Sequence, residues 1–154
     1  ESKVVDFAAV TSPLTIQKPL HKTHLASYRE ILIGGTKYKE LASQIRSLND
    51  LSGIPVIGLA DGTGTRELYH RYFLSHGLMF APDMEAATTD QILPMITHNL
   101  GIGFYPEELA AEAIARGSAY AIRLVEPIPE REICLVTNSS TQMSAAVRKV
   151  ISFL

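Results

Sequence analysis

Residues 54–73, IPVIGLADGTGTRELYHRYF, decide the fold class. The apolar run 54–60 predicts a buried strand, and a glycine-rich turn follows it directly. Behind the turn, Leu68, Tyr69, Tyr72 and Phe73 form one apolar stripe with the helical period. Thr63 is the expected N-cap of this helix. A strand that leads into a helix in this way is the building unit of an α/β protein.

The same alternation extends in both directions from this stretch. We expect further strands at residues 4–10, 30–33, 79–87, 100–105, 121–125 and 131–137. We expect further helices within 38–51, after Thr88, from Pro106 onward and at 143–154. Residues 15–27 are polar and predict a connector. The order of elements therefore predicts an α/β fold with largely parallel sheets.

The helix after Thr88 carries three local signals. Thr88 and Gln91 have the spacing of a capping box. Pro94 falls a few residues inside the helix, where it should remove a hydrogen bond or bend the first turn. Asn99 stands where a left-handed residue ends this helix, and Gly77 stands at the same position after the preceding helix.

Composition and charge limit the class of protein. The 154 residues include 46% hydrophobic and 19% charged residues, with a formal net charge of −2. This segment lacks the basic surface of a nucleic-acid binder. The single cysteine, Cys134, excludes an internal disulfide and suits a reducing compartment. No apolar run approaches a membrane span, and residues 1–6 do not resemble a signal peptide. Because a strand begins almost at residue 1, we expect a preceding segment to be missing.

Two helix starts are candidates for binding a polar ligand. The first is at Thr63 and Thr65, and the second is at Thr88 and Thr89. Each would combine free backbone N–H groups with hydroxyls at the carboxyl end of a strand, where open α/β sheets bind their ligands. A capped helix start with no ligand explains the same residues. A nucleotide loop is disfavoured, because Glu67 replaces the third glycine of that motif.

The sequence shows no catalytic set, metal set or cofactor motif. His21 and His24 are three residues apart, but no cysteine or carboxylate pair completes a metal site. Cys134 alternates with apolar residues in a predicted strand, which indicates a buried, inert thiol. The pair Glu107 and Glu108 is explained by the positive end of a helix dipole.

Several stretches together resemble the effector-binding domain of LysR-type transcriptional regulators. Residues 5–10 (VDFAAV) resemble a strand of its first lobe, and residues 48–57 (LNDLSGIPVI) resemble its "sl-x-dL-x-g-x-p-x-I" segment. Residues 62–66 (GTGTR) look like its "g-[ST]-x-x-R" helix start. The best match is residues 96–106 (ITHNLGIGFYP), although Asn99 replaces the usual first glycine.

The resemblance implies a two-lobe, type 2 periplasmic-binding-protein-like α/β fold in which lobe one is incomplete. Lobe I would combine residues 1–25 with 106–154, and lobe II would span residues 26–105. The opening strand-helix units and the helix-turn-helix domain of the family have no counterpart in these residues.

The family's effector contacts can be carried over by position. The matching residues follow three predicted strands: Thr11 and Ser12; Asp61, Gly62, Thr63 and Gly64; Thr88 and Thr89.

The resemblance implies a cytoplasmic, non-enzymatic sensor without cofactor or metal. A small polar or anionic metabolite would bind between the lobes and change the conformation of a DNA-bound oligomer, which is a dimer or tetramer when full length. DNA would be bound only through the domain that is absent here. An extracytoplasmic solute-binding protein of the same architecture is the alternative, and an enzyme on the same fold is a third possibility.

Overall fold

The computed structural model describes residues 7–11 and 20–138 of the chain. The chain forms two compact units. Unit 1 contains Glu1–Tyr28 and Arg131–Leu154, and unit 2 is the continuous segment Arg29–Glu130. Each unit has a β-sheet of its own. The predicted helix at 143–154 lies outside the described residues.

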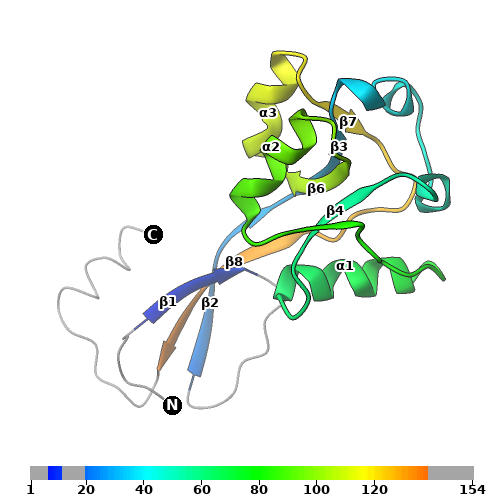
Figure 1. Cartoon of the computed structure of the whole chain (residues 1–154). Helices are drawn as coiled ribbons and strands as arrows, with labels where there is room; N and C mark the ends of the chain where they lie inside the picture. Colours follow the sequence, from blue (N-terminus) through cyan, green and yellow to red (C-terminus); the bar gives the residue numbers. More distant parts are fainter. Residues whose placement is uncertain (1–6, 12–19, 139–154) are drawn as a thin grey trace. The chain divides into compact units, whose positions relative to one another are not determined.

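Unit 1 contains a three-stranded antiparallel sheet (Figure 1). Its strands are β1 (Phe7–Thr11), β2 (Leu20–Tyr28) and β8 (Arg131–Asn138), and β8 lies in the middle. The connector predicted at 15–27 is wrong from residue 20 onward, because β2 pairs with β8 along its length. That pairing joins segments far apart in the sequence, and it forms despite the polar composition of β2. Cys134 on β8 is fully buried, as predicted.

Unit 2 contains a five-stranded sheet with the order β5-β4-β6-β3-β7. In chain order the strands are β3 (Glu30–Gly34), β4 (Val56–Leu59), β5 (Met84–Ala86), β6 (Ile102–Pro106) and β7 (Tyr120–Ile122). Strand β4 is parallel to β5 and β6, whereas β3 is antiparallel to β6 and β7. The α/β class is therefore confirmed, but the sheets are not largely parallel: the sheet of unit 1 is antiparallel and the sheet of unit 2 is mixed.

Helices cover both faces of this sheet (Figure 1). Helix α1 (Gly64–Leu74) packs on one face, and its apolar stripe joins Leu32 and Phe104 in a buried cluster. Helices α2 (Ile92–Thr97) and α3 (Glu107–Ala115) lie over the other face, where Ile33 is buried. Leu32 and Ile33 are neighbours in β3 but belong to different clusters. Successive side chains of a strand point to opposite faces of the sheet, and both faces are covered here.

Short 3-10 turns replace the helix expected within 38–51. They are Thr36–Tyr38, Leu41–Ser43 and Leu48–Leu51, and a fourth, Thr89–Gln91, leads into α2. Because α2 itself begins at Ile92, Pro94 is its third residue, where a backbone N–H has no intrahelical acceptor. The left-handed backbone predicted for Gly77 and Asn99 is confirmed.

The boundaries of the two compact units differ from those of the predicted lobes. Residues 106–130, which we assigned to lobe I, group with unit 2. The physical reason is that β7 pairs with β3, and Ala110 of α3 is buried against the five-stranded sheet. How the two units correspond to the family's lobes stays a prediction.

Candidate functional site

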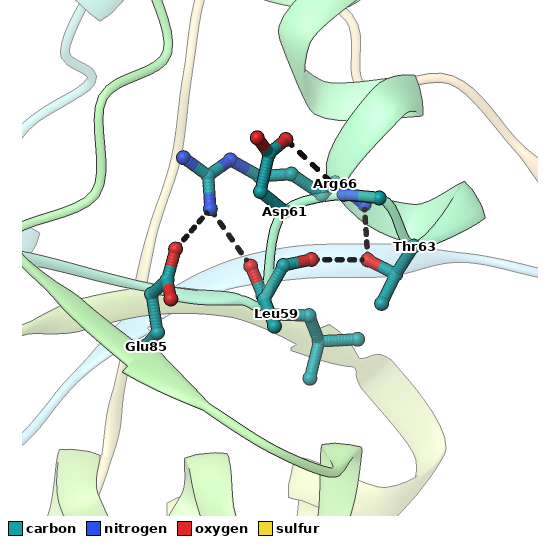
Figure 2. Close-up of polar contacts among 7 residues, drawn as sticks. Leu59, Asp61, Thr63, Arg66 and Glu85 are labelled. Carbon is teal, nitrogen blue, oxygen red and sulfur yellow. Dashed lines mark hydrogen bonds and ion pairs between the residues drawn. The ribbon is translucent and has the colours of Figure 1, made fainter.

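The first predicted helix start is held by Thr63, the N-cap of α1 (Figure 2). Its hydroxyl accepts a hydrogen bond from the backbone N–H of Arg66 at 3.1 Å and donates one to the carbonyl of Ala60 at 2.9 Å. A hydroxyl has only one proton, and here that proton is committed to the protein. Thr63 therefore shapes the loop, and its remaining capacity toward a ligand is as an acceptor.

Asp61 and Gly62 complete the turn between β4 and α1. The Asp61 carboxylate accepts a hydrogen bond from the N–H of Gly62 at 3.1 Å, and both residues are exposed. Gly62 has a φ of 89°, a conformation that L side chains rarely adopt. The turn thus depends on glycine at this position and displays the Asp61 carboxylate to solvent.

Arg66 fastens the first turn of α1 to the sheet. One guanidinium nitrogen donates to the carbonyl of Leu59 and to the carboxylate of Glu85, both at 2.9 Å. The guanidinium also lies 5.7 Å from the centroid of the Phe80 ring, within the range of a cation–π contact. The arginine of the "g-[ST]-x-x-R" stretch therefore has a structural role that joins α1, β4 and β5.

The second predicted helix start follows β5. Thr88 precedes the 3-10 turn Thr89–Gln91, but its side chain makes no capping hydrogen bond. The Gln91 side chain accepts from the N–H of Ala87 at 2.9 Å rather than from that of Thr88, so neither bond of the predicted capping box forms. Thr88 and Thr89 are both exposed.

The sheet brings these two loops to the same edge. Leu59 and Ala86 are paired residues of the parallel strands β4 and β5, and each loop begins directly after its strand. Six of the eight predicted contact residues lie on these loops: Asp61, Gly62, Thr63, Gly64, Thr88 and Thr89. The structure therefore groups them at the carboxyl ends of adjacent strands, where α/β proteins bind ligands.

The other two predicted residues belong to unit 1. Thr11 is the last residue of β1 and pairs with Ile133 of β8. Ser12 lies outside the described residues. Their part in the site stays a prediction.

Sequence reasoning missed a buried carboxylate at the same sheet edge. Glu30 is 7% exposed, begins β3 and pairs with Pro106, and it accepts a hydrogen bond from the hydroxyl of Tyr69 on α1. The only signal for it was an acidic residue at the start of an apolar strand.

Tyr105 on β6 is a second buried polar group in unit 2. Burial raises the pKa of its phenol above the ordinary value, and the carboxylate of Asp90 raises it further. The Tyr105 phenol therefore keeps its proton to a higher pH than an exposed tyrosine does.

Two features of the described residues bear on the type of site. Across residues 7–11 and 20–138, no group of three His, Cys, Asp or Glu residues could hold a metal ion. In the same part of the chain no helix is long and apolar enough to span a membrane.

Comparison with known proteins identifies the family. A model of the LysR substrate binding domain matches residues 1–154. The uncharacterized HTH-type transcriptional regulator YeiE of Escherichia coli K12 is 24% identical over 142 residues, which are 90% of this chain and 48% of YeiE. The chain thus spans about half the length of the curated relatives it matches.

Solved structures show the same fold. The Synechocystis PCC6803 CcmR regulatory domain, solved in complex with 2-PG, has a TM-score of 0.80 at 17% identity over 96% of this chain and 71% of that one. The CrgA regulatory domain, a LysR-type regulator from Neisseria meningitidis, has a TM-score of 0.74 at 17% identity, over 97% and 73% of the two chains. These similarities confirm the predicted periplasmic-binding-protein-like α/β fold class. The chain belongs to the LysR substrate binding domain family.

Proposed function

We propose that this chain is the effector-sensing domain of a LysR-type transcription regulator. It would bind a small polar metabolite between its two lobes and shift the conformation of a cytoplasmic, DNA-bound oligomer. The metabolite acts through its different affinities for two lobe arrangements, since a ligand can change an equilibrium only by that difference. DNA contact belongs to a helix-turn-helix domain outside these residues.

One observation in the structure supports this proposal above the others. The two loops that the family resemblance assigns to the effector end adjacent parallel strands, Leu59 beside Ala86. Their exposed polar groups, Asp61, Thr88 and Thr89, face solvent at one sheet edge. Family membership favours this sensor over an exported solute-binding protein of the same architecture.

The variant Thr88→Val is a more specific test of the site than Thr63→Val. Thr63→Val removes a helix cap as well as a hydroxyl, and losing such a cap costs about 1 kcal/mol of stability. Thr88 makes no capping bond, so Thr88→Val changes the site without that side effect. Thr97→Val is the matched control, because the Thr97 hydroxyl bonds only within α2, to the carbonyl of Pro94.

The experiment begins with a thermal-shift screen of the full-length regulator. The screen includes 2-PG and shikimate, which are bound in structures of related domains. Calorimetry with the compound that stabilises the protein most should show Thr88→Val weakening binding roughly three- to tenfold, the value of one hydrogen bond. Thr97→Val should bind like the native protein. Unchanged affinity in both Thr63→Val and Thr88→Val would refute these contact assignments.

A further inference from the structure

A cavity of about 360 Å³ opens in unit 2 where β7 leaves the edge of β3. Strand β7 pairs with Leu32, Ile33 and Gly34, whereas β3 begins two residues earlier. After Ile122 the chain turns away to pair with Arg46. The cavity fills the space that this departure leaves beside the start of β3.

The walls of the cavity are fixed by hydrogen bonds. On the far side, the carbonyl of Glu126 accepts from the Tyr72 hydroxyl at 2.9 Å, and the Glu126 carboxylate accepts from the N–H of Leu48 at 3.0 Å. The half-buried side chains of Leu124 and Ile128 give the cavity its accessible apolar surface. A cavity of this size with apolar walls and a few polar groups is typical of a small-molecule site.

Two arginines line this cavity, and neither forms an ion pair with a carboxylate of the described residues. Arg29 and Arg123 are exposed, and no hydrogen bond or ion pair of either guanidinium to a described residue is present. The other five arginines in the described part of the chain all have side-chain interactions: Arg46, Arg66, Arg71, Arg116 and Arg131. The two guanidiniums without a side-chain interaction in the described part of the chain therefore both line this one cavity.

The backbone holds both arginines in place. The carbonyl of Arg29 accepts from the N–H of Glu107 at 2.9 Å, and the carbonyl of Arg123 accepts from the N–H of Arg46 at 2.8 Å. Each arginine side chain thus extends from a hydrogen-bonded backbone position beside the cavity.

Three acidic residues also line the cavity, and two of them are engaged by the protein. Glu126 accepts from Leu48, and Glu30 accepts from Tyr69. The third, Glu107, is exposed in the first turn of α3, where the helix dipole already favours a negative charge. With Glu126 and Glu30 bonded to protein donors, the charged groups left to contact a ligand are two guanidiniums and the carboxylate of Glu107.

We propose that this cavity is a ligand site for a small organic carboxylate with an apolar body. The planar guanidiniums of Arg29 and Arg123 would bind the carboxylate with charge-assisted hydrogen bonds. The body would lie against Leu124 and Ile128, which line the same cavity and are half-buried.

The cavity and the proposed effector loops lie beside different strands, although Glu30 of the cavity is at the same end of the sheet as the loops. The loops follow β4 and β5, whereas the cavity lies beside β3 and β7, at the opposite end of the sheet order. Strands β4 and β3 are two strand spacings apart, roughly 10 Å. The inference thus goes beyond the proposed function and does not depend on it.

The test uses the 154-residue chain and two matched probes, 3-phenylpropionate and its uncharged amide, 3-phenylpropanamide. Binding is followed by calorimetry and by amide chemical shifts. The acid should bind saturably, and the amide at least tenfold more weakly. The double variant Arg29→Gln, Arg123→Gln should weaken acid binding at least tenfold, since each charged hydrogen bond is worth about 1.5–3 kcal/mol. Arg71→Gln, on an exposed α1 arginine paired with Glu67, should bind like the native chain.

The outcome depends on where the probe binds and on whether its binding requires the negative charge. Shifts at Ile31, Leu124 and Ile128, and an affinity that falls with added salt, support the site. Equal binding of acid and amide, an unaffected double variant, or no saturable acid binding up to about 10 mM overturns it. Shifts centred on Thr63 and Thr88 also overturn it, and they would support the effector loops instead. Equal thermal midpoints of the variants show that a loss of binding is not a loss of folding.

Discussion

Asn99 shows how much a single residue contributes to unit 2. Its φ of 62° places it in the left-handed region, where it ends α2. Its side-chain oxygen accepts from the N–H of Lys37 at 3.0 Å, and its amide donates to the Thr36 hydroxyl at 3.2 Å. A Cβ atom at Gly35 would collide with the same side chain. Asn99 therefore joins the end of α2 to the turn after β3.

Substitutions at Asn99 should separate the backbone role from the side-chain role. Asn99→Gly keeps the left-handed backbone and loses two hydrogen bonds, for a cost of about 1 kcal/mol. Asn99→Ala loses the same bonds and adds left-handed strain, for a total of about 2–3 kcal/mol. Urea unfolding measures both changes. Asn49→Ala, at an exposed residue with φ outside the left-handed region, should stay within about 0.5 kcal/mol of the native chain. Equal costs for Asn99→Ala and Asn99→Gly would show that backbone strain is not involved.

The sequence was sufficient to predict the backbone of Asn99 but not its contacts. A left-handed residue after a helix follows from local spacing. Lys37 and Thr36 lie 62 and 63 residues away, so their hydrogen bonds to Asn99 depend on the strand order of the sheet. The same limit applies to Arg66, whose position was noted in the motif but whose partner Glu85 was not foreseen.

Helix α1 was predicted well because its signals are local. The N-cap Thr63 and the apolar residues spaced three and four apart lie within one segment. Strand β2 was missed because its pairing with β8 joins residues about a hundred positions apart. Elements defined by their own sequence can be predicted, whereas those defined by a distant partner cannot.

Tyr72 links α1 to the segment before β8 and should make stability depend on alkaline pH. Burial raises the pKa of its phenol well above 10, and the Glu126 carboxylate raises it further. The unfolded phenol ionises near pH 10 while the folded one keeps its proton. The contribution of Tyr72 is therefore complete below pH 10 and is lost as the pH rises above it.

Tyr72→Phe tests this dependence. At pH 8 the variant should be about 1 kcal/mol less stable, because the hydrogen bond to the Glu126 carbonyl is gone. Above pH 10 the native chain should lose about 1.4 kcal/mol per pH unit relative to the variant, so the difference closes near pH 11. Other tyrosines titrate in both proteins and cancel in the comparison. Urea unfolding at pH 8, 9, 10 and 11 measures the difference, and a constant value across that range would contradict the assignment.

At the scale of the whole molecule, the two loops of the candidate site were predicted separately, and the pairing of strands brings them together. The loops at Gly62 and Thr88 were each identified from a strand followed by a helix start. That they lie at one edge depends on the pairing of β4 with β5, which no local pattern specifies. The cavity lined by Arg29 and Arg123 was not foreseen, because it arises where two strands separate.

The division into two units predicts that unit 2 folds alone. Its residues, 29–130, are one continuous segment, and both buried clusters of the five-stranded sheet lie within it. Unit 1 instead needs two segments from opposite ends of the chain to form its sheet. An isolated 29–130 fragment should therefore unfold in one cooperative urea transition and give dispersed amide resonances. It should also bind 3-phenylpropionate like the 154-residue chain, because every residue that lines the carboxylate cavity is included. A fragment without a cooperative transition would show that the five-stranded sheet depends on unit 1 for its stability.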